Sequence, residues 1–194
     1  MSKSIKKIVY IAMLSAVAVA LMYFEFPIPF IPPFYKIDLS DVPAVIGGFI
    51  LGPVAGVSIE AIKVILHGLT KGTESAWVGE IANFIIGSVF IIPSAIIYKK
   101  NKTKKSAVLG MTIGCLLMAL VGIVVNVYIL LPMYAKLFLG SIENIIEVSN
   151  KANPYINGIW SLAILAVVPF NIIKGIIISI ITFLLYKTVR KVIK

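Results

Sequence analysis

The sequence predicts an all-α integral membrane protein: one domain over residues 1–194, with six transmembrane helices and both termini in the cytoplasm. Composition is the first observation behind this prediction. Hydrophobic residues make up 60% of the chain and charged residues 13%, against about 45–50% and about 25% in soluble domains. The mean hydropathy is +1.04. Too few polar side chains are present to cover a soluble globule, so a soluble enzyme is excluded.

Long apolar segments are the second observation, because a helix needs about 20 such residues to cross a bilayer. One of them is interrupted at Gly52-Pro53, a turn signal that strains helical geometry. We expect two short helices there, tilted or partly shielded by protein. The six predicted helices cover approximately residues 5–27, 40–51, 53–67, 78–98, 106–137 and 159–187.

The third observation is the distribution of positive charge. Three clusters contain basic residues and no acidic ones: Lys3, Lys6 and Lys7; the five lysines of 99–105; and Lys187, Arg190, Lys191 and Lys194. Six crossings place all three on one face, whereas five would divide them. Cytoplasmic loops are rich in Lys and Arg, so loops 27–41, 68–77 and 138–157 lie outside. The net charge of +10 therefore fits a membrane, and no nucleic acid is expected.

Sequence motifs for catalysis are missing. No Gly-x-x-x-x-Gly-Lys-Ser/Thr loop is present, so the chain is not expected to hydrolyse ATP. His67 is the only histidine and Cys115 the only cysteine, which argues against a zinc site or an acyl-transfer triad. We expect no enzyme activity, no metal and no cofactor. His67 is interpreted as an interfacial residue at a helix end.

Charged side chains inside the predicted spans need a reason, because each costs about 2.5–3.5 kcal/mol on insertion scales. Glu60 and Lys63 are three residues apart and share a helix face. They form either an internal ion pair or part of a ligand site. Glu80 and Asn83 have the same spacing, and either lock the preceding loop or face a ligand.

The segment around Pro169 favours a ligand site over a structural lock. Proline removes one helical hydrogen bond, and irregular backbone at membrane depth is tolerated where it lines a cavity or packs on protein. Asn171 and Lys174 share a face after this proline, next to Phe170. The segment thus combines an aromatic ring, an amide and an ammonium. Asn126, six residues before Pro132, is a similar amide.

Two further features have alternative interpretations. Ala12, Ala16 and Ala20 recur at every fourth position, a spacing that lets another helix approach closely. This stripe either packs within its own bundle or docks onto a separate membrane subunit. Residues 27–38 contain four prolines and several aromatic residues. They form either an interfacial aromatic belt or a lid over an outward-facing pocket.

Five segments together match the pattern of a known family, although any one alone would be a weak signal. They are Lys36–Ala44, Gly52–Gly56 followed by Glu60 and Lys63, Gly79–Phe84, Asn126–Pro132 and Pro169–Gly175. Through them nearly the whole chain resembles the substrate-binding membrane subunits of energy-coupling factor (ECF) vitamin transporters, specifically the riboflavin-binding type. No clear departure is seen at these positions.

The resemblance implies a vitamin pocket that opens outward, formed by loops 1, 3 and 5 and the outer parts of helices 4–6, in a prokaryotic cell membrane. The implied partners are riboflavin, one transmembrane coupling subunit, which contacts Ala12, Ala16 and Ala20, and two cytoplasmic ATPases. The candidate ligand-binding residues are Asn126, Asn171, Lys174, Glu80, Asn83, Asp41, Leu39, Phe170 and Trp77.

The chemistry of riboflavin agrees with this set. Amides donate and accept hydrogen bonds and an ammonium donates them, which suits a mostly apolar pocket with a few placed polar groups. Two alternatives stay open. The first is the same architecture for another vitamin or a flavin nucleotide, although no outer lysine cluster would neutralise a phosphate. The second is an intramembrane enzyme that uses Glu60, Glu80 and Lys174.

Overall fold

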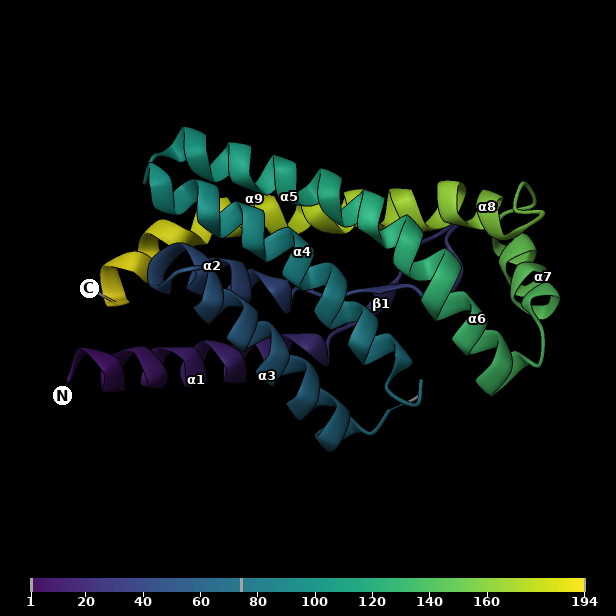
Figure 1. Cartoon of the computed structure of the whole chain (residues 1–194), viewed down its shortest axis with the longest axis horizontal. Helices are drawn as coiled ribbons and strands as arrows, with labels where there is room; N and C mark the ends of the chain where they lie inside the picture. The colour runs from purple at the N-terminus through teal and green to yellow at the C-terminus, as the bar shows by residue number, and fades with distance from the viewer. Residues whose placement is uncertain (1, 74, 194) are drawn as a thin grey trace.

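The helices of the chain run side by side along an elongated bundle (Figure 1). The computed structural model describes residues 2–73 and 75–193. Both chain ends lie at one end of the bundle, and the short helices α7 (Ile142–Ala152) and α8 (Ile159–Leu162) lie at the other. The body of the bundle consists of α1 (Lys3–Met22), α2 (Asp41–Leu51), α3 (Pro53–Lys71), α4 (Val78–Lys100), α5 (Lys104–Val125) and α9 (Val168–Ile193).

Five helical segments within the described ranges are long and apolar enough to cross a membrane. They are Ser4–Met22, Pro53–Lys71, Val78–Lys100, Lys104–Phe138 and Ile159–Val189. The remaining predicted helix, α2, has 11 residues and covers roughly 17 Å of a hydrocarbon core that is about 30 Å thick. Its residues from Asp41 to Phe49 are all buried. Protein rather than lipid therefore surrounds α2.

The break between α2 and α3 lies at the Gly-Pro pair. Gly52 has φ +102°, a conformation that favours glycine, and Pro53 takes the first position of α3, where its missing N–H costs nothing. The two helices then pack closely, because a Cβ on Gly56 would lie 2.9 Å from the Ala44 carbonyl oxygen. Small residues at this crossing let α2 fit inside the bundle.

Two predictions about the loops are wrong. The first helix ends at Met22 rather than at 27, and a short antiparallel hairpin follows, with β1 (Phe26–Pro27) paired to β2 (Lys36–Ile37). The hairpin means that the chain is not entirely α-helical. The first helix could not have continued through Pro27, because proline lacks the N–H that a helical hydrogen bond needs. The predicted loop 138–157 contains α7, whose first turn is capped when the Asn144 N–H donates to the Ser141 hydroxyl.

The two longest predicted helices are not continuous α-helices. The π-helical segments η1 (Asn126–Leu130) and η2 (Ala135–Leu139) follow α5 and flank α6 (Leu131–Tyr134), and η3 (Ala163–Val167) joins α8 to α9. Pro132 and Pro169 each follow a π segment within two residues. A proline is tolerated there because the regular hydrogen-bond ladder is already altered.

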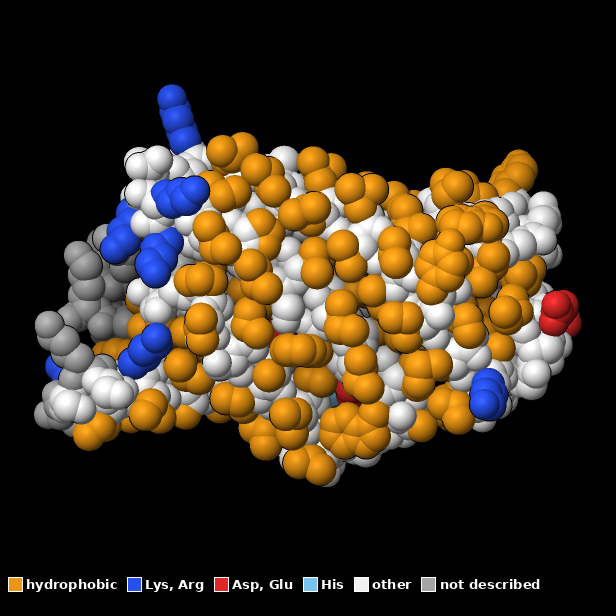
Figure 2. Space-filling view, viewed as in Figure 1, with side chains coloured by type: hydrophobic (Ala, Val, Ile, Leu, Met, Phe, Trp, Pro, Cys, Tyr) orange, Lys and Arg blue, Asp and Glu red, His pale blue; other side chains and the backbone are white. Residues whose placement is uncertain are grey.

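The surface separates apolar from basic side chains. Figure 2 shows hydrophobic side chains across the middle of the bundle, and lysine side chains gathered at the end that holds the termini. This is the arrangement expected for a protein whose middle contacts lipid. Lys194 and Glu74 lie outside the described residues, as do the side chains of Lys3, Arg190 and Lys191.

Candidate functional site

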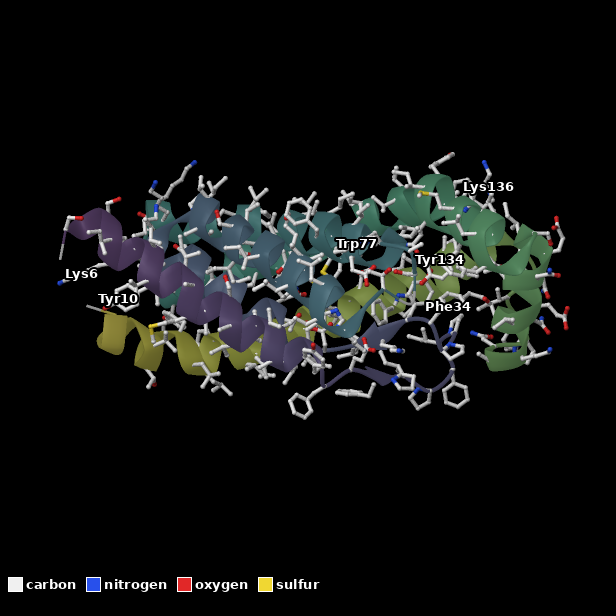
Figure 3. All side chains as sticks on the ribbon, turned by 90° about the horizontal axis from the view of Figure 1, so that it is seen from below. Lys6, Tyr10, Phe34, Trp77, Tyr134 and Lys136 are labelled. Carbon is white, nitrogen blue, oxygen red and sulfur yellow. The ribbon has the colours of Figure 1, made fainter. Side chains whose placement is uncertain are left out.

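A cavity of about 520 Å³ lies among the loop that connects α1 to α2, helices α3 and α4, the segment from α5 to η2, α7 and α9. Its size falls in the range of small-molecule sites, about 300–1,000 Å³. Two of its wall residues, Phe34 and Tyr134, lie far along the bundle from Lys6 and Tyr10 of α1 (Figure 3). The cavity is therefore toward the end opposite the termini.

Two buried amides form part of the cavity wall. The Asn126 side-chain N–H donates to the Gly122 carbonyl at 2.8 Å, and its Oδ1 accepts from the Tyr35 hydroxyl at 2.7 Å. Asn171 Nδ2 donates to the Val167 carbonyl at 2.9 Å. An amide nitrogen carries two N–H groups, so each residue keeps a further donor for a guest molecule.

Both amides lie next to π-helical turns. Asn126 is the first residue of η1, and the carbonyl that accepts from Asn171 belongs to Val167, the last residue of η3. Single π turns inside helices are rare and often mark functional sites. Here they set the rotation of the two helices so that both amides meet the same cavity.

Lys174 lines the cavity but its charge is already balanced. Its Nζ lies 3.1 Å from Asp41 Oδ2 and 3.3 Å from Asp38 Oδ2. Asp38 also accepts hydrogen bonds from the backbone N–H and the hydroxyl of Ser40. Burying an ammonium requires such partners. Lys174 therefore offers the cavity a hydrogen-bond donor rather than an uncompensated charge.

The same network continues to α3. Lys63 Nζ lies 2.6 Å from Asp41 Oδ1 and 2.6 Å from Glu60 Oε1, and donates to Asn83 Oδ1 at 3.3 Å. Asp41 thus joins two lysines from α3 and α9, one on each carboxylate oxygen. Of the two interpretations of Glu60 and Lys63, the structure shows the internal ion pair. Neither residue is among those that line the cavity in the described part of the chain.

An aromatic wall stands beside the amides. The ring centroids of Phe34 and Tyr35 are 4.8 Å apart, those of Tyr35 and Phe170 are 5.3 Å apart, and Phe34 stacks on Tyr134 at 6.3 Å. Burial holds the pKa of the Tyr35 phenol well above its ordinary value, so the hydroxyl stays a donor to Asn126. Flat apolar rings pack well against such a wall.

A second polar group lines the cavity on the side of α3. Glu25, after the end of α1, accepts from Lys36 Nζ at 2.9 Å and from Lys71 Nζ at 2.6 Å. Burial alone would raise the pKa of Glu25, but the hydrogen bonds and charges of Lys71 and Lys36 hold it below its ordinary value. The contact ties the hairpin to the end of α3.

The loop before α4 is also tied to the cavity wall. The Ser75 hydroxyl donates to Glu80 Oε2 at 2.6 Å and accepts from the Gly79 N–H at 3.0 Å. Glu80 therefore locks the loop and lines the cavity as well. The two interpretations of Glu80 do not exclude each other.

The cavity brings together six of the nine residues that the sequence nominates as ligand-binding: Asn126, Asn171, Lys174, Glu80, Asn83 and Phe170. The other three are elsewhere. Asp41 is buried behind Lys174, Leu39 packs against the main core, and Trp77 has φ +69° and lies over Gly68. These three do not line the cavity among the described residues.

Sequence reasoning misses several residues that line the cavity: Glu25, Lys36, Lys71, Ser75, Tyr134 and His67. His67 is 5% exposed and belongs to the cavity wall rather than to an interface. Lys36 and Lys71 are far apart in the sequence, yet both bind Glu25, so lysines do gather at the cavity. The prolines and aromatics of residues 27–38 were a usable signal for Phe34 and Tyr35.

The structure shows where the alanine stripe lies and which partners the three residues proposed for an enzyme have. Ala12, Ala16 and Ala20 are exposed, whereas Ser15 and Ala18 on the same helix are buried. The stripe thus does not pack within its own bundle. Glu60 pairs with Lys63, Glu80 accepts from Ser75, and Lys174 pairs with Asp38 and Asp41, so each of the three residues already has a partner in the fold.

Comparison with known proteins agrees with this architecture. Residues 6–186 match the family described as ECF transporter, substrate-specific component. The chain belongs to this family. Its members are transport components rather than enzymes. The family, its bacterial relatives and the five apolar helices together identify the chain as a multi-pass protein of a prokaryotic cell membrane.

Several relatives have names that specify a substrate. The chain is 36% identical to the riboflavin transporter RibU of Staphylococcus aureus, over 97% of this chain and 93% of that protein. It is 37% identical to the riboflavin transporter FmnP of Bacillus subtilis, over 94% and 90%. A solved structure of the S component of a bacterial ECF transporter matches with TM-score 0.76 and 34% identity, covering 99% of each chain.

Proposed function

We propose that this chain captures riboflavin from outside the cell as the substrate-binding subunit of an ECF transporter. One observation supports this most: two amides and a charge-balanced ammonium line the same cavity as a wall of aromatic rings. The isoalloxazine ring of riboflavin is flat and largely apolar, with donors and acceptors along one edge. The aromatic wall suits the face of that ring, and the amides suit its edge.

The pairing of the lysines favours the uncharged vitamin over a flavin nucleotide. Lys174 binds Asp38 and Asp41, and Lys36 and Lys71 both bind Glu25. A phosphate would have to compete with these carboxylates for the ammonium groups. A neutral ligand only needs hydrogen bonds from them, which costs no rearrangement of charge.

The proposal includes the arrangement in the membrane and the partners. The chain crosses six times, with α2 as the short sixth crossing, and both termini are cytoplasmic, so the cavity opens outward. Release into the cell requires a transmembrane coupling subunit and two ATPases, which the substrate-binding subunit lacks. The exposed stripe of Ala12, Ala16 and Ala20 is the surface on which the coupling subunit docks.

Ligand identity is tested by binding. Protein purified from riboflavin-fed cells is expected to be yellow, and apo protein to quench the fluorescence of added riboflavin. Asn171→Ala should weaken that binding, while Asn101→Ala, at the exposed α4–α5 turn, should not. A colourless protein that ignores riboflavin but binds thiamin would show another vitamin, and tighter binding of flavin mononucleotide would show the nucleotide.

Docking is tested by separating binding from uptake. Ala16→Leu adds bulk to the exposed stripe, so we expect uptake of labelled riboflavin by cells to be lost while binding by the purified subunit stays normal. Val108→Leu is the control, because Val108 is also exposed but lies on α5 rather than on α1. It should leave both uptake and binding unchanged. Normal uptake by Ala16→Leu would remove the stripe from the docking surface.

A further inference from the structure

The wall that α3 contributes to the cavity contains an unsatisfied imidazole. His67 is 5% exposed and lines the cavity, yet neither ring nitrogen has a hydrogen-bond partner among the described residues. The ring of Tyr23 lies edge-on to it, with centroids 5.2 Å apart. Buried polar groups are nearly always paired, so a side chain left in this state next to a cavity calls for a ligand.

The surroundings of His67 differ from those of the two amides. One turn along α3, Lys71 binds Glu25, and Glu80 of α4 binds Ser75. These groups are hydrophilic and line the same cavity. The aromatic rings, in contrast, gather around Asn126 and Phe170. Hence the cavity has a polar side and an aromatic side.

The polar side and the aromatic side of the cavity come from helices that do not pack closely on each other in the described part of the chain. Helix α3 packs against α1, α2 and α4, whereas α9 packs against α2 and α5. His67 and the segment that holds Asn171 and Lys174 therefore belong to different walls of the cavity. An amphipathic guest whose ring occupies the aromatic side extends its polar end toward α3.

We propose that His67 recognises the polyhydroxyl tail of the flavin by hydrogen bonding to one of its hydroxyl groups. This inference rests on the proposed function and adds the subsite that reads the tail. A neutral imidazole has one donor and one acceptor nitrogen. A hydroxyl group can serve either one, so the contact forms in both tautomers. A ligand group that only accepts hydrogen bonds could serve the donor nitrogen alone, and an apolar group could serve neither nitrogen.

The experiment compares two ligands on the same variant. Riboflavin carries the tail, and lumiflavin has the same ring system with a methyl group in its place. For His67→Leu we expect riboflavin binding to weaken about tenfold, the scale of one lost hydrogen bond. Lumiflavin binding should change less than about twofold, because the ring subsite is untouched. Retained lumiflavin binding also shows that the variant is folded.

Two further variants of His67 and one control make the result specific. His67→Gln keeps a donor and an acceptor and should recover most of the riboflavin affinity, whereas His67→Met should reproduce the loss. Ser88→Ala is the matched control, because the Ser88 hydroxyl is also buried without a partner in the described part of the chain but does not line the cavity. It should leave both ligands unaffected.

The outcomes separate this inference from the function on which it rests. Equal loss of riboflavin and lumiflavin in His67→Leu and His67→Met would overturn the tail assignment and make His67 a structural residue. Unchanged riboflavin binding in both variants would also overturn it. If the unmodified protein binds neither flavin, it is the proposed function that fails, and this is visible before any variant is made.

Discussion

The ammonium of Lys174 on α9 lies 3.1 Å from the carboxylate of Asp41 at the start of α2. The same carboxylate lies 2.6 Å from Lys63 on α3 through its other oxygen. One short helix, buried from Asp41 to Phe49, therefore contacts both buried lysines. Because Lys174 borders the cavity, the packing of α2 and the geometry of the binding site are joined by a single side chain.

Removing one charge from this network should destabilise the protein strongly. Lys174→Met leaves Asp38 and one oxygen of Asp41 buried without their cation. We expect the free energy of unfolding to fall by about 3–5 kcal/mol, the usual cost of breaking a buried pair from one side. Thermal or denaturant unfolding of the purified protein in detergent measures this.

The rescue follows from the same argument. In the double variant Lys174→Met/Asp38→Asn the uncompensated carboxylate is also removed, so part of the stability should return. Lys151→Met breaks an exposed pair with Glu147 and serves as the control, with little change expected. A Lys174→Met protein as stable as the parent would show that the network is not holding α2 and α9 together.

The hydroxyl of Tyr35 should contribute to affinity by orienting an amide. Tyr35→Phe keeps the ring contact with Phe170 but removes the 2.7 Å hydrogen bond to Asn126. We expect flavin binding to weaken about two- to tenfold, measured by fluorescence titration. Tyr128→Phe, 66% exposed on the same π segment, is the control. Equal flavin affinities for the Tyr35→Phe and Tyr128→Phe variants would mean that the Tyr35 hydroxyl does not orient Asn126 for binding.

Gly122 tests the position of Asn171 without removing a polar group. A Cβ on Gly122 would lie 2.6 Å from Asn171 Nδ2, so Gly122→Ala forces that amide to turn and lose its bond to Val167. Flavin affinity should drop about tenfold if one hydrogen bond to the ligand is lost. Gly158→Ala has nothing within 4 Å of the added methyl and should bind normally. Normal binding by Gly122→Ala would remove Asn171 from the site.

The contact of Glu25 with Lys36 and Lys71 should survive mild acid. The pKa of Glu25 is lowered from 4.5 in the folded protein, so its stabilising effect is complete above that value and is lost as the pH falls through the lowered pKa. Glu25→Gln should therefore reduce the melting temperature at neutral pH, and the gap to the parent should close only below pH about 4. A gap that closes by pH about 6 would contradict the assignment.

The sequence signals are clearest where the polarity of a side chain does not suit its predicted surroundings. Asn126, Asn171 and Lys174 stand out because apolar spans rarely contain such groups, and all three line the cavity. Gly52-Pro53 stands out because no regular helix accommodates it. In both cases the signal is local and can be identified without knowing which helices are neighbours.

What the sequence could not reveal depends on contacts between distant segments. Asp38 and Lys174 are separated by 136 positions, and no periodicity indicates that they pair. His67 looks like an ordinary helix-end residue in the sequence, whereas the fold buries it in the cavity wall. Trp77 is among the predicted ligand-binding residues, but its ring lies over Gly68 and its backbone has φ +69°. The start of α7 was accessible in principle, because Ser141 is a typical N-cap residue.

The π turn that begins at Asn126 determines how this chain tolerates a change in length. Each such turn holds one residue more than regular helix geometry needs. Deleting a single residue from 127–130 would let the ladder become regular, and the segment beyond it would keep its rotation because the turn had absorbed the extra residue. Tyr134 and the rest of that wall would then stay close to their present orientation. The same deletion in the regular part of α5 would rotate everything beyond it by about 100°, so the π turn is the place where this helix can lose a residue at the least cost.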